Sequence, residues 1–289
     1  MLAPVLLWAA KAALSVSVLL GLGAVTLRLD VMSRAALDPS EAVVVLRRAL
    51  TMAAWGAALA MLAMGVRALA QAAGLAFPGE SLTPLFLDVF RFGDLRSLLL
   101  IQSGAAVVAF ASFAVARTGA ILAWISAAGA MLLLAVVLGL DGHASAAEAP
   151  LIPIAAATLH VVGAGAWLGT LWHLWRAIHT RSAGRLVAAF HRVALLGAGI
   201  VVVSGAIQAW GLIASPADLI ASPWGRLLLA KLALVVVVLF LGHRHWRGAT
   251  ADLAAGDRRQ IARSFSVEVV VALAVVLLSA LLATTSPPA

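Results

Sequence analysis

The sequence predicts an all-α fold, a polytopic membrane helix bundle of about eight transmembrane helices with both termini on the periplasmic side. Three observations predict it. Hydrophobic residues make up 64% of the 289 residues and charged residues only 11%, whereas a soluble domain carries about 25% charged residues. Eight apolar runs are long enough to cross a bilayer. Basic residues gather at the ends of these runs, mostly on one side, and so set the orientation.

The eight runs are each close to the ~20 residues that cross the hydrocarbon core of a bilayer. We expect the first to be a retained helix, because it is too long for the core of a signal peptide. A longer, partly apolar loop follows the second run, at residues 74–94, and we expect a short interfacial helix there. The runs are approximately Pro4–Leu27, Val43–Leu69, Leu98–Val115, Gly119–Leu140, Leu151–Trp175, Val193–Ala214, Leu227–Trp246 and Ser264–Thr284.

The distribution of Lys and Arg orients the bundle. Fourteen of the twenty basic residues lie in the loops after the first, third, fifth and seventh runs, which we therefore assign to the cytoplasm. The net charge of +8 is explained by this anchoring role, so we do not expect nucleic-acid binding. The runs divide into two halves of four helices, residues 1–140 and residues 141–289.

Among the ionisable side chains within the predicted spans, four stand out: Lys11, His160, Lys231 and Glu268. Such residues are costly in a bilayer and are candidates for function. The chain has no cysteine, so a thiolate metal site and a disulfide are excluded. A further histidine, His143, lies in the outer loop before the fifth run.

A soft metal ion is one ligand that these residues could hold. His160 lies about 13 Å below the outer end of its helix, at 1.5 Å per residue. The same depth count places Met61, Met64 and Met131 near its level, and thioethers with imidazole suit Cu(I). The alternative is that the methionines simply fill the core and that His160 makes a backbone hydrogen bond.

The remaining costly residues predict a path through the membrane. We expect Lys231 to lie near the outer mouth, with Asp141 or a carbonyl as its partner, and Glu268 near the inner end, at the level of His243. Their depths differ by about 15 Å, which argues against a direct ion pair between Lys231 and Glu268. Most of the other histidines, His173, His179, His191 and His245, are expected to face water or lipid headgroups.

Several motifs in the second half of the chain resemble the bacterial copper resistance D (CopD/PcoD-type) inner-membrane proteins. The resemblance covers residues 139–288 well and the first half only by its helix layout. There are departures at Gln102, Thr170, Trp224 and His243, where the family usually has other residues. The motifs that carry the resemblance are "DGHA" followed by "LHVVGAGAWLGTL", "FHRVALLGAGIVVVSGAIQAW", "PWGRLLLAKLALVVVVLFLGHRHWR", "RSFSVEVVVALAVVLLSALLATTSPP" and, loosely, "FRFGDLRSLLLIQSGA".

The resemblance implies copper handling in the bacterial inner membrane, beside a periplasmic copper-binding protein of the CopC type. The positions in this sequence that the resemblance implies are functional are His143, His160, Lys231 and Glu268. We therefore expect a copper-binding membrane protein that moves copper, not an enzyme. Two alternatives stay open: a haem-binding redox protein, which would need a second histidine facing His160, and a copper-delivery factor that does not transport.

Overall fold

The chain folds into a bundle of long helices. The computed structural model describes residues 2–92, 95–142, 145, 149–213, 215–254 and 258–288, and this part of the chain contains no β-strand. Its α-helices are α1 (Leu2–Thr26), α2 (Met32–Ala35), α3 (Pro39–Leu75), α4 (Leu82–Arg91), α5 (Leu95–Val115), α6 (Ile121–Leu140), α7 (Leu151–Ala164), α8 (Thr170–Ala177), α9 (Ala183–Trp210), α10 (Asp218–Ala221), α11 (Pro223–Ala254) and α12 (Arg258–Leu282). Two π-helical segments, η1 (Leu27–Val31) and η4 (Gly165–Gly169), and a short 3-10 segment, η2 (Ala116–Thr118), continue or join them.

Within the described part of the chain, eight helices are long and apolar enough to span a membrane, and each contains most of one predicted run. The predicted all-α bundle is confirmed. The largest differences are at helix ends. The α9 helix begins at Ala183, ten residues before its predicted apolar run, and α11 begins at Pro223. Hydropathy marks only the part of a helix that lies in lipid, whereas the hydrogen-bonded helix can continue beyond it, as in α9. The start of α11 at Pro223 fits the preference of proline for the first position of a helix.

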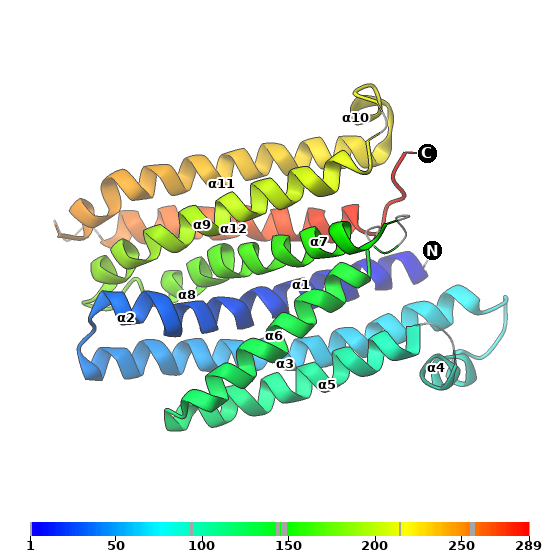
Figure 1. Cartoon of the computed structure of the whole chain (residues 1–289), viewed down its shortest axis with the longest axis horizontal. Helices are drawn as coiled ribbons and strands as arrows, with labels where there is room; N and C mark the ends of the chain where they lie inside the picture. Colours follow the sequence, from blue (N-terminus) through cyan, green and yellow to red (C-terminus); the bar gives the residue numbers. More distant parts are fainter. Residues whose placement is uncertain are drawn as a thin grey trace.

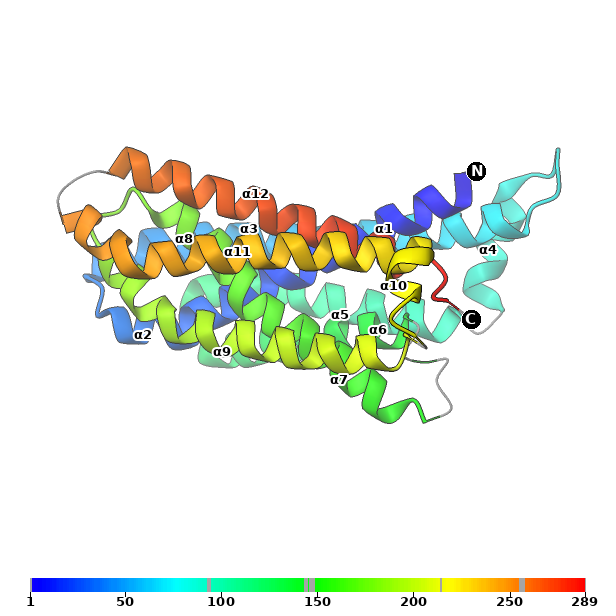
Figure 2. The ribbon, with the colours of Figure 1, turned by 90° about the horizontal axis from the view of Figure 1, so that it is seen from above.

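The spanning helices run back and forth along one axis, so both termini lie at the same end of the bundle (Figure 1). The α4 helix lies outside the bundle at that end, across the direction of the long helices (Figures 1 and 2). It buries Val89 against Ala68 and Leu99 while Leu87 is exposed. This is the short helix that the partly apolar loop predicts. The assignment of this end to the periplasm stays a prediction.

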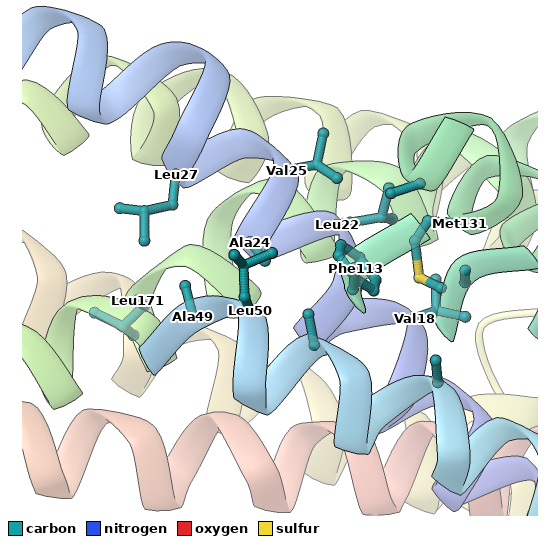
Figure 3. Packing of buried hydrophobic residues seen from close by; sticks show 14 of the residues in the cluster. Val18, Leu22, Ala24, Val25, Leu27, Ala49, Leu50, Phe113, Met131 and Leu171 are labelled. Carbon is teal, nitrogen blue, oxygen red and sulfur yellow. The ribbon is translucent and has the colours of Figure 1, made fainter. Parts of the chain in front are cut away.

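The α1 helix occupies the middle of the bundle. It packs against α3 and α6, against the α7–η4–α8 segment, and against α12. Figure 3 shows part of the resulting core, where Val18 and Leu22 of α1 lie near Phe113 and Met131. On α3 the buried positions are mostly alanine. Small residues let membrane helices approach closely, which replaces the hydrophobic driving force that lipid does not supply.

A close approach joins α1 to η4, at Gly23 and Gly169. A Cβ atom on Gly23 would overlap the backbone of Gly169, and a Cβ atom on Gly169 would overlap the carbonyl of Leu19. Thr170, one of the departures from the family pattern, is fully buried at this crossing. Its Oγ1 donates a hydrogen bond of 3.3 Å to the Gly23 carbonyl. Backbone contact at this point therefore places the α7–α8 segment along α1.

The crossing makes a testable prediction. Gly169→Ala should destabilise the protein by about 1–3 kcal/mol, the usual cost of overpacking, because backbone cannot move aside as a side-chain tip can. Gly199→Ala is the matched control, since nothing lies within 4 Å of the added Cβ atom. The control should keep or slightly raise stability, as alanine favours a helix. Equal melting temperatures for the two variants in detergent would contradict the crossing.

Candidate functional site

A cavity of about 270 Å³ lies near the end of the bundle that carries the termini. Its walls come from α1, α7, α9, α11 and α12, together with the end of α6 and the residues after it. Much of the wall is apolar, from residues such as Leu138, Ile207 and Leu228. The ionisable and amide side chains that line it are Lys11, Asp141, His160, Gln208 and Lys231. The cavity therefore reaches from the end of α6 down to the level of His160.

His160 is held in this cavity by α9. Its Nδ1 lies 3.2 Å from the hydroxyl of Ser204, and that hydroxyl donates a hydrogen bond of 2.5 Å to the carbonyl of Ile200. The next residue, Gly205, makes room for the ring, since a Cβ atom there would lie 3.1 Å from His160 Cε1. The Ser-Gly pair in the middle of α9 thus both orients and accommodates the histidine.

This hydrogen-bond pattern selects one tautomer of His160. The proton of the Ser204 hydroxyl is used by the Ile200 carbonyl, so the Ser204 oxygen acts as the acceptor for His160. The Nδ1 atom of the ring must then carry a proton and donate it. In a neutral imidazole the other nitrogen, Nε2, keeps a lone pair. His160 can therefore offer Nε2 to a metal ion, and its hydrogen-bonded Nδ1 resembles that of most metal-binding histidines.

An ionic cluster closes the outer part of the cavity wall. Arg67 of α3 donates a hydrogen bond of 2.5 Å to the Asp141 carboxylate. The Nζ atom of Lys11 lies 4.0 Å from the same carboxylate oxygen and donates to the carbonyls of Asp141 and Ala283, at 2.9 and 3.2 Å. Burial raises the pKa of the Asp141 carboxyl, while the two cations act in the opposite direction. The cluster ties α1, α3 and the ends of α6 and α12 together.

Arg67 is the member of this cluster that sequence reasoning missed. The charge count treats Arg67 as a flanking residue at the predicted periplasmic end of the second apolar run. In the structure α3 continues to Leu75, so Arg67 lies within the helix and is buried. The length of α3 is the signal that could have found it. Asp141 was expected as a partner for Lys231, and the structure instead surrounds its carboxylate with Arg67 and Lys11.

Lys231 lies deeper than its apolar run predicts. Because α11 begins at Pro223, Lys231 is about 12 Å along the helix at 1.5 Å per residue, close to the depth of His160 in α7. It lines the same cavity as His160. Of the described residues, no carboxylate forms an ion pair with it. The structure therefore brings Lys231 to His160.

The three candidate methionines do not line the cavity. Met131 is fully buried in the main core, where its side chain packs over Gly21 (Figure 3). Met61 packs against the same core, and Met64 packs against the small cluster around Val89. The rotation of each helix turns these side chains away from the cavity. The described residues also contain no group of three or more His, Asp or Glu side chains that could hold a metal ion.

The remaining predicted residues lie elsewhere. His143 lies outside the described residues. Glu268 is buried on α12, and its Oε1 would lie 3.4 Å from a Cβ atom on Gly242. This contact puts the carboxylate beside the part of α11 that carries the exposed His243. The depth count predicts that Glu268 and His243 lie at the same level. This level is at the end of the bundle opposite the cavity.

His173 does not face water or headgroups, so that expectation is wrong for this residue. It is 3% exposed, and its Nε2 lies 2.9 Å from the carbonyl of Leu20 on α1. The His173 side chain faces α1 because α1 and η4 are in backbone contact at Gly169, one helical turn before His173. His179, by contrast, is exposed as expected.

The fit between His160 and Gly205 makes a second prediction. Gly205→Ala should displace the ring, and the copper affinity predicted for His160 from the sequence should then fall by about 10–100-fold, the usual effect of disturbing the support of a metal ligand. Gly199→Ala, on the same helix with open space around it, should bind like the unchanged protein. Copper affinity of the purified proteins, measured by competition with a chelator, checks this. Full affinity in Gly205→Ala would show that His160 is not a ligand.

Comparison with known proteins identifies relatives of this chain. The family described as Copper resistance protein D matches residues 184–282, which include most of α9 and all of α10, α11 and α12. The copper transport protein CutJ of Bacillus subtilis (strain 168) is 28% identical over 155 residues. That alignment covers 51% of this chain and 28% of the length of CutJ. No solved structure matches the chain. The family resemblance predicted from the sequence is confirmed.

Proposed function

We propose that this multi-pass bacterial membrane protein, whose residues 184–282 match the family described as Copper resistance protein D, binds copper at His160 and moves it across the inner membrane. The observation that carries the proposal is the pairing of His160 with Ser204, which leaves the lone pair of Nε2 for a metal ion. The imidazole nitrogen is a suitable ligand for copper. A relative whose name describes copper transport supports the same cargo.

The ligand set favours a passing ion over a resident one. His160 is the only histidine among the described residues that line the cavity. One imidazole holds copper weakly compared with a full set of protein ligands, and conduction requires binding that is weak enough to release the ion. Copper would complete its coordination with water or with ligands that enter the cavity with it.

The proposed route begins at the end of the bundle that carries the termini, which the charge distribution assigns to the periplasm. His143, in the loop after Asp141, would receive the ion, with a CopC-type protein as the proposed donor. Along α12 the cavity wall ends at Ser279, about 16 Å from Glu268. Apolar residues of α12, such as Val269 and Val276, line only a narrow space of about 30 Å³ between them. In the proposed transport cycle, this arrangement would be a state closed toward Glu268.

Glu268 would act at the inner end as the gate or the proton-coupling group, beside His243. The sequence contains no nucleotide-binding loop, so the proposed movement follows a gradient or is coupled to another ion. Haem is the less favoured cargo, because the second deeply buried histidine, His173, faces Leu20 of α1 and not the cavity. A delivery factor that binds copper without transporting it remains the second candidate, distinguished by the experiment below.

The central residue of the proposal can be tested directly. His160→Ala should lose copper bound to the purified protein and copper uptake into liposomes, because it removes the only imidazole in the described cavity wall. His179→Ala removes an exposed histidine at the other end of the bundle and should behave like the unchanged protein. Copper bound without uptake would identify a delivery factor. A Soret band in the purified protein would indicate haem, and unchanged copper content in His160→Ala would overturn the site.

A further inference from the structure

The charges of the cavity do not balance. Lys11 and Lys231 contribute two positive charges to the wall, and Asp141 contributes one negative charge. The carboxylate of Asp141 is already engaged by Arg67 at 2.5 Å. The ammonium of Lys11 also has partners, the carbonyls of Asp141 and Ala283. Lys231 is left as a cation without a hydrogen bond or ion pair to any described residue.

A second donor without a partner lies in the same wall. Trp224 is 3% exposed, and its indole N–H has no hydrogen-bond acceptor among the described residues. Trp224 and Lys231 are seven residues apart on α11, which puts them on one face of the helix, two turns from each other. Helical side chains lean toward the start of their helix, so Lys231 leans toward Trp224. Buried donors are normally satisfied, so the unpaired indole N–H of Trp224, on the same helix face as the half-buried Lys231, points to a missing acceptor.

The unpaired ammonium also conflicts with a bare copper ion. Lys231 and His160 line the same cavity at a similar depth along their helices. Two like charges near one another in a medium of low dielectric constant repel strongly. A copper cation on His160 would therefore be disfavoured by Lys231 unless a negative charge entered with it.

We propose that the cavity binds a small organic carboxylate at Lys231 and Trp224, and that copper reaches His160 together with this anion. The carboxylate would accept hydrogen bonds from the ammonium and from the indole N–H, and would cancel the charge of Lys231. The second part of this statement rests on the proposed copper function, whereas the first part stands without it.

Size and lining favour a carboxylate over other anions. A volume of about 270 Å³ has room for several water molecules at ~30 Å³ each, which is more than a halide needs. The apolar residues Leu138, Ile207 and Leu228 suit a short aliphatic body. One free ammonium and one indole match a single negative charge, while a phosphate would call for several charged donors.

The first experiment uses copper-free protein in detergent and propionate as the probe, followed by saturation-transfer NMR. Propionate should bind saturably, and propionamide, which has the same shape without the charge, should not. Lys231→Met should weaken propionate binding about tenfold or more, and Trp224→Phe should weaken it by a smaller factor, as hydrogen bonds to a charged group are the stronger ones. Arg226→Gln, which removes an exposed cation on the same helix, should have no effect.

Lys231→Arg keeps the charge and should retain binding, which separates loss of the site from misfolding. Equal binding of propionate and propionamide, or full binding by a monodisperse Lys231→Met protein, would overturn the carboxylate site. Chloride that competes with propionate at equal concentration would replace the carboxylate by a halide and would also overturn the proposal.

The second experiment measures copper affinity in perchlorate buffer with and without propionate. Propionate should tighten copper binding to the unchanged protein, and this effect should vanish in Lys231→Met. In perchlorate alone, Lys231→Met should bind copper more tightly than the unchanged protein, because the repulsion is gone. Propionate binding with no copper binding in any buffer would contradict the proposed copper function while leaving the carboxylate site intact. Copper binding unaffected by propionate would overturn the joint entry.

Discussion

The backbone contact between Gly23 and Gly169 is the constraint on which the rest of the arrangement depends. Because neither residue has a Cβ atom, α1 and the π-helical segment η4 touch directly. The helices on either side of η4 are then held along α1. His173, after the crossing, is directed at the Leu20 carbonyl, whereas His160, before it, lines the cavity and meets Ser204. The two buried histidines of one span therefore have different surroundings.

Most of the costly groups in the half of the bundle that carries the termini have polar partners. Asp141 is surrounded by two cations, Lys11 also donates to two helix-end carbonyls, and His160 hydrogen-bonds a serine. A buried ion pair rarely stabilises a fold much, but breaking one by removing a partner is expensive. The cluster around Asp141 is thus best understood as holding α1, α3 and the ends of α6 and α12 together around the cavity. Lys231 stands apart from this pattern, and an unsatisfied polar group calls for an explanation, which the proposed carboxylate supplies.

The spans were predictable because lipid demands long apolar helices, and the costly residues were predictable because they interrupt those runs. Their partners were not. The depth of Lys231 depends on α11 beginning at Pro223, which lies before the apolar run and is not marked by hydropathy. Met131 has the right depth but the wrong rotation, since it packs over Gly21. Arg67 and Asp141 are 74 residues apart in the sequence, and only the packing of α3 against the end of α6 brings them into contact.

The central claim is that copper binds the Nε2 atom of His160 within the cavity. X-ray absorption spectroscopy of the copper-loaded protein tests it most directly, because imidazole and thioether ligands scatter differently. The account predicts imidazole scattering that disappears in His160→Ala and persists in His179→Ala. Sulfur scattering alone, or imidazole scattering that survives in His160→Ala, would contradict it.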